Sequence, residues 1–476
     1  MQGIPQLERH TILILATPNF ASWLEASSDF IPKALQCVFG ASSLVEADVV
    51  CGVCDGVAPH PLSMKSPSGA GFSVLHKPWK IDNLWDNIDT RTGSNNLQST
   101  LSFLVRARFD ATLTLPLANT LFNNGRLSTL LLSRWKSSGD SFEISRDQIE
   151  KQNIAMKLFT RAFSIPRDLI PCVPLTPLRR IHSGLGNIVR TIDFSQDGKS
   201  DIGPASRELE RSVTEYLAKG GHDQPTIGVW ALVIPQEVLS ILRYETRLEE
   251  ELTTTDIDAL RAEISHSTPK GRRYMGRCIE EGARLVRVLS GGGGWGLKEG
   301  LLSLDPQTTY RDSNESRYDY SEGFLDEQQA SALGNVAQEG DFIQFLVAAK
   351  NDEGPVNSLP RNEPEEVDFT QSSTVVGVVP STVDDVHDEI KNVSTTSNIQ
   401  IYPGHFGIVS ESGIFLGGVK EKKTDNGKVI RSIETKIDLP FSYFYEEHGK
   451  RGSRVSRVDE GAERLGDEID SDARIV

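Results

Sequence analysis

Residues 11–57 read TILILATPNFASWLEASSDFIPKALQCVFGASSLVEADVVCGVCDGV, and this stretch decides the class of fold that the sequence predicts. Thr11 to Ala16 is a short β-rich apolar run, and a Thr-Pro-Asn turn closes it. The next segment has apolar residues near helical spacing, and Pro32 suits a position near a helix start, so we expect two helical pieces. Residues 45–57 form a second apolar run that ends on Asp-Gly. The order strand, helix, strand predicts an α/β layer rather than an all-β barrel.

The rest of the chain continues with strands and helices. Residues 203–221 predict a capped helix, because Pro204 stands near the start and Gly220 at the end. The apolar run 226–235 predicts a central strand. Residues 341–348 predict another strand, and the apolar runs between 373 and 437 predict an antiparallel sheet with a turn at Ser410 to Gly413.

The predicted domain organisation is two α/β parts of similar size with mixed or antiparallel sheets. A chain of 476 residues exceeds the size at which a single core stops growing, about 250–300 residues. We expect an N-terminal domain over 1–195 and a C-terminal domain over 203–446. Residues 351–369 are rich in Pro, Asn, Asp, Glu and Gly and predict a loop insertion. Residues 447–476 mix both charges with few large apolar residues, which predicts a disordered tail.

The charge balance restricts the kinds of partner. The formal net charge is −16 and the pI is about 5.1, whereas a nucleic-acid binder normally carries a basic domain or stripe. No apolar run reaches the roughly 20 residues of a membrane-spanning helix. We therefore expect a small molecule or a protein as partner, no nucleic acid and no membrane insertion. The start has no secretory or transit pattern, so we expect a cytoplasmic location; a mitochondrial one stays open if the natural start lies upstream.

The cysteines and histidines predict no metal site and no cofactor. Five cysteines are too scattered for a disulfide framework. Cys51 and Cys54 have a CxxC spacing, but a four-ligand zinc site needs a second pair, and none occurs. Two small residues that face opposite sides of a buried strand explain this spacing better. The nine histidines do not cluster along the sequence.

Residues 289–300, LSGGGGWGLKEG, form the most unusual stretch. The segment before it has helical periodicity up to Leu289, and neither Ser nor Thr follows Lys298, so a P-loop is disfavoured. One glycine suffices for a helix C-cap. The additional glycines indicate close backbone approach to a ligand or to another chain segment. The candidate ligand-binding residues in this stretch are Gly292, Gly293, Gly294, Trp295 and Lys298.

Arg180, His182 and His405 are further candidates for ligand binding. An arginine holds carboxylates or phosphates through forked hydrogen bonds, and both histidines stand next to glycines. The alternative for each is an ordinary surface or turn residue. No GxSxG, HExxH or EF-hand motif occurs, so no catalytic set is predicted. An accessory enzyme of metabolite biosynthesis would require His182 and His405 to converge on one pocket.

The order of elements over residues 11–57 is similar to the N-terminal part of FIST domains. The matching positions are the small residues Cys51, Gly52, Cys54 and Gly56 at the end of the second strand. FIST domains are α/β sensory modules that bind small ligands, and in eukaryotes some follow an F-box. The resemblance implies a non-enzymatic ligand-binding or scaffold protein in signal transduction. This chain has no F-box ahead of it, so a ubiquitin-ligase adaptor role is not implied. A subunit or assembly factor of a mitochondrial complex is a further alternative.

Overall fold

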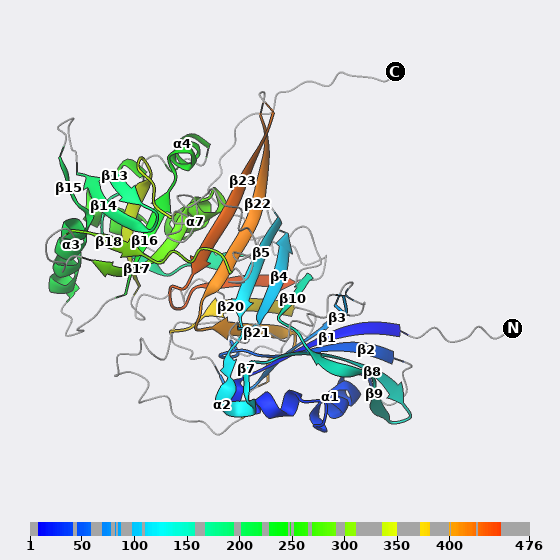
Figure 1. Ribbon diagram of the computed structural model, residues 1–476. Coiled ribbons are helices and arrows are strands. Elements are labelled where there is room, and N and C mark those ends of the chain that lie inside the picture. The colour runs from blue at the N-terminus through cyan, green and yellow to red at the C-terminus, as the bar shows by residue number, and fades with distance from the viewer. Residues whose placement is uncertain are drawn as a thin grey trace, which may run out of the picture.

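The computed structural model describes residues 8–40, 45–58, 69–77, 81, 84–86, 98–106, 110–157, 167–194, 201–220, 228–245, 248, 252–264, 269–291, 300–310, 336–349, 372–380, 399, 401–424 and 427–448. Of these residues, 50% lie in strands and 22% in helices. The predicted combination of sheets and helices is therefore right in part. Sheets dominate, and the few helices cover them instead of following every strand (Figure 1). The predicted insertion at 351–369 and nearly all of the predicted tail at 447–476 lie outside the described residues.

The N-terminal sheet is built on the stretch 11–57. Its strands, in spatial order, are β3 (Phe72–Lys77), β1 (Glu8–Ala16), β2 (Val45–Val53), β8 (Leu130–Ser138) and β9 (Ser141–Glu150). β1 and β2 are parallel, as strand–helix–strand order requires, and the other pairs are antiparallel. The connection contains η1 (Pro18–Leu24) and α1 (Phe30–Phe39). Ile31 and Leu35, one helical turn apart, bury α1 against the sheet.

Two further sheets combine strands from both ends of the chain. The central sheet has the order β10 (Asn153–Lys157), β4 (Thr100–Arg106), β5 (Asp110–Pro116), β22 (Ile414–Thr424) and β23 (Gly427–Ile437). The small sheet has the order β11 (Arg167–Leu169), β24 (Tyr443–His448), β20 (Ser372–Val378) and β21 (His405–Ser410). β20 and β21 are parallel, so the region after residue 372 is not the single antiparallel sheet that its sequence predicts.

The fourth sheet closes on itself. Its pairings run from β13 (Arg179–Leu185) through β14 (Ile188–Asp193), β18 (Leu302–Leu304), β17 (Arg284–Gly291), β16 (Val229–Ile234) and β19 (Phe342–Ala348) back to β13. We call these strands the ring. β12 (Cys172–Pro174) pairs with β19, and β15 (Ile202–Pro204) pairs with β14. The helices beside the ring are α3 (Ala205–Gly220), α4 (Gln236–Glu245), α6 (Ile257–Glu263) and α7 (Pro269–Glu280).

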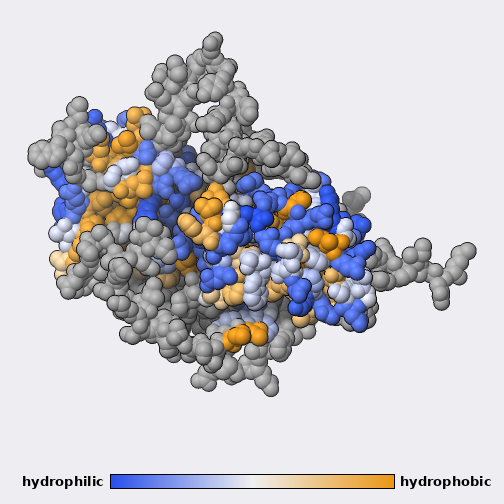
Figure 2. All heavy atoms as spheres, turned by 60° about the horizontal axis from the view of Figure 1, so that its bottom comes forward, coloured by the Kyte–Doolittle hydropathy of each residue, from blue (hydrophilic) through white to orange (hydrophobic). Residues whose placement is uncertain are grey.

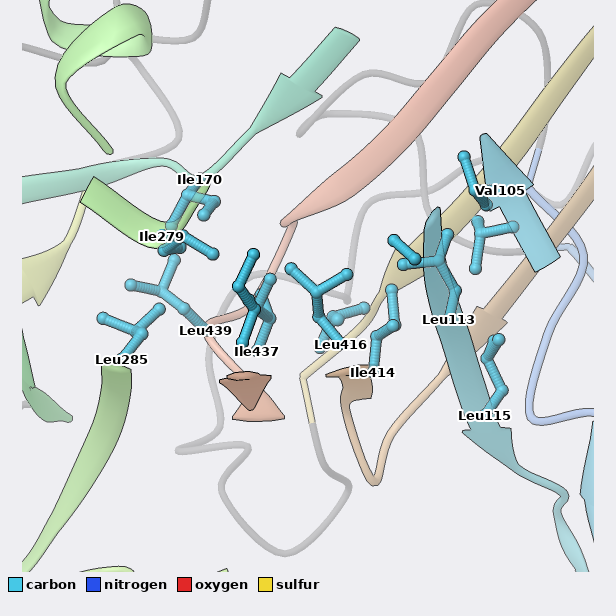
Figure 3. Close-up of a cluster of buried hydrophobic side chains, with 14 of the residues drawn as sticks. Val105, Leu113, Leu115, Ile170, Ile279, Leu285, Ile414, Leu416, Ile437 and Leu439 are labelled. Atoms are coloured by element: carbon cyan, nitrogen blue, oxygen red, sulfur yellow. The ribbon is translucent and has the colours of Figure 1, made fainter. Parts of the chain in front are cut away.

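One hydrophobic core joins the sheets. Figure 3 shows it as a continuous row of side chains from Leu285 of the ring, through Ile437 and Ile414, to Leu113 of the central sheet. Polar contacts reinforce the junction between ring and central sheet. The backbone N–H of Leu285 donates to the Thr435 hydroxyl at 2.8 Å, and that hydroxyl donates to the Leu285 carbonyl at 3.1 Å. This cluster therefore contains residues from both halves of the chain, whereas the cluster on the α1 side of the N-terminal sheet comes only from residues 12–142.

The strand pairings cross the predicted domain boundary near residue 200. β12 to β14, from the predicted N-terminal domain, pair with β18 and β19 of the ring. In the opposite direction, β22 pairs with β5, and β24 pairs with β11. Among the described residues, three of the sheets therefore combine strands from before and after residue 200. The order of strands along the sequence does not reveal this, because the partner of a strand depends on its hydrophobic face and its register.

The turn at Asn123-Asn124-Gly125 reverses the chain without forming a long hairpin. Residues 121–124 make the single-turn helix α2 (Leu121–Asn124), and Gly125 follows with φ of 79°. Only the short strands β6 (Asn119–Thr120) and β7 (Arg126–Ser128) pair across it. The longer flanking strands β5 and β8 go to different sheets.

Candidate functional site

The glycine-containing turn after β2 contacts β21 directly. The Val409 N–H donates to the Gly56 carbonyl at 3.0 Å, and the Ala58 N–H donates to the Gly407 carbonyl at 3.2 Å. These bonds attach residues near position 56 to residues about 350 positions later. The turn after β2 and the beginning of β21 therefore meet, although they are far apart in the sequence. They meet through backbone hydrogen bonds, so they form a joint between the N-terminal sheet and the small sheet.

Asp55 adds a carboxylate to this joint. The backbone N–H of Glu411 donates to Asp55 Oδ2 at 2.7 Å. Burial raises the pKa of Asp55 to about 6, and the hydrogen bond from Glu411 only partly opposes that rise. A partly buried carboxylate that accepts from one backbone N–H therefore connects the turn after β2 to the turn between β21 and β22.

His405 lies in the same joint and uses both ring nitrogens within the chain. Nδ1 is 2.9 Å from the Ser373 hydroxyl, and Nε2 is 2.9 Å from the Ala58 carbonyl. A carbonyl only accepts, so Nε2 carries the proton and Nδ1 accepts from Ser373. This arrangement gives His405 a structural role that joins β20, β21 and the turn after β2.

Arg180 and His182 lie elsewhere, on β13 of the ring. Both side chains are exposed and alternate with the buried Ile181, so they share the solvent side of the strand. Arg180 is in register with Asp193 of β14, and Asp193 is in register with Ile202 of β15. The structure therefore places Arg180 with His182, and it does not bring His182 to His405, which belongs to another sheet and another region of Figure 1.

The segment before the glycine loop is a strand, so the expected helix up to Leu289 is wrong in its second half. α7 ends at Glu280, and Gly282 has φ of 110°, a backbone conformation that suits glycine. Residues 284–291 then form β17, which pairs with β16 and with β18. Residues 284–291 form a strand despite the helical spacing of their apolar residues, because β16 and β18 supply backbone hydrogen-bond partners on both edges. The loop is consequently a connection between two antiparallel strands, an order that also differs from the strand–loop–helix of a P-loop.

The candidate residues Gly292, Gly293, Gly294, Trp295 and Lys298 lie outside the described residues. The end of their loop is described at Gly300, which has φ of 84°. A Cβ at this position would lie 3.0 Å from Pro204, at the last residue of β15. Pro204 is in register with Thr191, whose hydroxyl is 2.6 Å from that of Ser183, the residue after His182. Gly300 therefore lies next to β15, two strands away from β13, which carries Arg180 and His182.

The surface of the ring also has apolar side chains. Leu185, Ile202 and Leu289 are 65%, 43% and 56% exposed, and all three belong to its strands or to β15. On the face that Figure 2 shows, the larger hydrophobic areas lie towards the ring, while hydrophilic residues cover most of the part with α1. The ring and β15 therefore expose both cationic and apolar side chains.

A buried ion pair lies on the other side of β13. Arg179 Nε donates to Glu208 Oε1 of α3 at 2.9 Å, and their side chains are 9% and 1% exposed. The Arg179 guanidinium also lies 5.7 Å from the centre of the Phe194 ring. Among the described residues, no donor reaches Glu208 Oε2. Burial raises the pKa of Glu208, and the Arg179 charge opposes that rise.

Cys51 and Cys54 face opposite sides of the N-terminal sheet, as their spacing predicts for a buried strand. Cys51 packs with the α1 side of the sheet, and Cys54 packs in the core shared with the central sheet. Burial raises the pKa of each thiol to about 12. Both thiols are free and protonated at neutral pH, which excludes their action as a redox pair in this state.

One pair of histidines does come together, contrary to the expectation from the sequence. His76 Nε2 lies 3.1 Å from His10 Nδ1. The two residues are 66 positions apart, and the pairing of β1 with β3 brings them together. The alternation of side chains along β1 and along β3 tells which face of the sheet each histidine occupies. Only the register between the two strands shows that His10 and His76 are neighbours. No group of three or more metal-binding side chains occurs in the part of the chain that is described.

Comparison of the chain with protein-family models, with curated proteins and with solved structures gives no match. Within the described ranges, no helix has the length and apolarity that crossing a lipid bilayer requires.

Proposed function

We propose that this protein is a non-enzymatic binding protein or scaffold of the FIST type that takes a small anionic ligand at the ring. The ligand would lie over β13 and β14, next to the loop that leaves the ring at Gly291 and returns at Gly300. The observation that carries the proposal is the shared, exposed face of Arg180 and His182 on β13, on a sheet that also exposes apolar side chains.

The chemistry of these residues supports an anionic ligand. A guanidinium binds carboxylates and phosphates through two parallel hydrogen bonds, and an imidazole donates a third. Leu185, Ile202 and Leu289 offer apolar surface to the remainder of the molecule. The resemblance of residues 11–57 to FIST domains supports a sensory role rather than catalysis.

The joint between the N-terminal sheet and the small sheet supports the scaffold part of the proposal. Asp55, Gly56 and Ala58 are bonded to residues 407–411, and these bonds involve no residue of the ring. A ligand at the ring would therefore bind to a body that is already assembled.

A thermal-shift screen tests the proposal. We would use the full chain with a panel of monocarboxylates, dicarboxylates and phosphate monoesters. At least one compound should raise the unfolding temperature of the wild type, and Arg180→Gln and Trp295→Ala should each abolish that rise. Arg211→Gln is the matched control, because Arg211 is an exposed arginine on α3, with 66% of its side chain accessible. If no compound stabilises the wild type, or if all variants respond equally, the anionic site is wrong.

A further inference from the structure

The strand pairing at the edge of the N-terminal sheet brings two imidazoles within bonding distance of each other. β1 and β3 are antiparallel, and Ile12 is in register with His76. His10 precedes Ile12 by two residues, so both histidines lie on the same face of the sheet. His76 Nε2 and His10 Nδ1 are 3.1 Å apart. β1 and β3 lie next to each other at the end of the molecule from which the N-terminus leaves (Figure 1).

We propose that His10 and His76 form a two-histidine chelate for a divalent transition-metal ion such as Zn²⁺. Two Zn–N bonds of about 2.0–2.1 Å place the nitrogens about 2.9 Å apart at a right angle and about 3.3 Å apart at the tetrahedral angle. The observed 3.1 Å lies between these values. A small rotation of either imidazole would direct the lone pairs of His10 Nδ1 and His76 Nε2 at one ion. Water molecules would complete the coordination of the ion.

The protons balance without a further reactant. In the present geometry one ring donates its N–H to the other. When the ion binds, that donor ring changes tautomer, so each neutral imidazole keeps one proton on the nitrogen remote from the metal. Imidazole is a preferred ligand for zinc, copper and nickel, whereas calcium and magnesium require oxygen ligands.

The last residue of α1 packs against both imidazoles. Phe39, the last residue of α1, packs against both rings, with centroid distances of 4.9 Å to His10 and 5.3 Å to His76. The two imidazoles therefore lie at the C-terminal end of α1, where the backbone carbonyl groups of the helix carry partial negative charge. Lys77, the next residue along β3, places a positive charge near His76 that opposes a cation here.

The ion would connect two strands that are far apart in sequence. β3 is the terminal strand in the order of the N-terminal sheet. Metal binding to the folded state alone stabilises that state, so the chelate would hold this edge against β1. This role is independent of the ligand site proposed at the ring.

Isothermal titration of Zn²⁺ into the EDTA-treated full chain at neutral pH tests the proposal. The wild type should bind one Zn²⁺ with micromolar affinity at this site. His10→Gln and His76→Gln should each weaken that binding at least about tenfold, because one ligand of the chelate is lost. The control Cys37→Ser should keep it, because this variant removes only the exposed thiol of α1.

Unchanged affinity in both histidine variants, or no binding by the wild type, overturns the proposal. A second measurement guards against variants that fail to fold. In the NMR spectrum of the wild type, Zn²⁺ should shift the ring-proton resonances of His10 and His76 together. If Zn²⁺ binds while these resonances stay in place, the ion occupies another site and the proposal is again wrong.

Discussion

Replacing Gly407 by alanine should disrupt the joint between the N-terminal sheet and the small sheet. An ideal Cβ on Gly407 would lie 2.3 Å from the Ala58 carbonyl oxygen and 2.6 Å from His405 Nε2. Both distances are shorter than those at which non-bonded atoms normally lie, and the Ala58 oxygen belongs to the backbone, which cannot simply rotate away. Relief therefore requires Ala58 or β21 to move, which breaks the bonds of Ala58 with Gly407 and with His405.

The expected loss of stability follows from these bonds. Each net hydrogen bond contributes about 1 kcal/mol, and a buried group left without a partner costs about 1–3 kcal/mol. We therefore expect Gly407→Ala to lower the free energy of unfolding by about 3 kcal/mol. Gly417→Ala is the matched control, because that glycine lies on β22 and a Cβ there would meet no atom within 4 Å. Its stability should stay within about 0.5 kcal/mol of wild type.

Urea unfolding followed by tryptophan fluorescence compares the two variants at equal protein concentration. Gly407→Ala should unfold at a clearly lower urea concentration than wild type, and Gly417→Ala at the same concentration. If both variants have the wild-type midpoint, β21 and Ala58 separate without cost, and the joint does not hold the sheets together.

Two further perturbations test buried charges. Arg179→Met should destabilise the protein by about 3–5 kcal/mol, because Glu208 loses its buried partner, and Arg179→Met with Glu208→Leu should recover most of that loss; equal urea midpoints for single and double variants would contradict this. Burial raises the pKa of Asp55 from an ordinary value of 3.8 to about 6, so its contribution to stability is complete below the lower value and is lost as the pH rises through the upper one. Between these two pH values the free energy of unfolding should fall by about 3 kcal/mol because Asp55 ionises. In urea titrations over the same pH range, Asp55→Asn should not show this fall. A fall of the same size in Asp55→Asn would show that another group titrates.

The sequence alone predicts the elements with strong local signals. The strand–helix–strand order of 11–57 is confirmed by β1, α1 and β2, because the apolar runs and Pro32 act within a few residues. The helix over 203–221 is confirmed as α3, where Pro204 precedes the first turn and Gly220 ends the last. The opposite orientations of Cys51 and Cys54 also follow from sequence, since three positions along a strand reverse the face.

The candidate site was predictable only in part. Arg180 and His182 share a face because alternation along one strand brings them there. The glycines next to His405 made it a reasonable candidate for ligand binding. In the structure, however, both nitrogens of its imidazole are hydrogen-bonded within the protein, to Ser373 and to Ala58. The helical spacing up to Leu289 was misleading, because β17 has partner strands on both sides.

By itself the sequence determined where chain segments are apolar, where they turn and which faces they expose. Tertiary structure alone decided which strands pair: β5 with β22, β11 with β24, and β13 with β19. The same pairing brought His10 to His76 and Asp55 to residue 411. The physical reason is that a strand carries no local record of its partner. Its edge offers the same backbone groups to every other strand, and the choice depends on how all the hydrophobic faces are buried together.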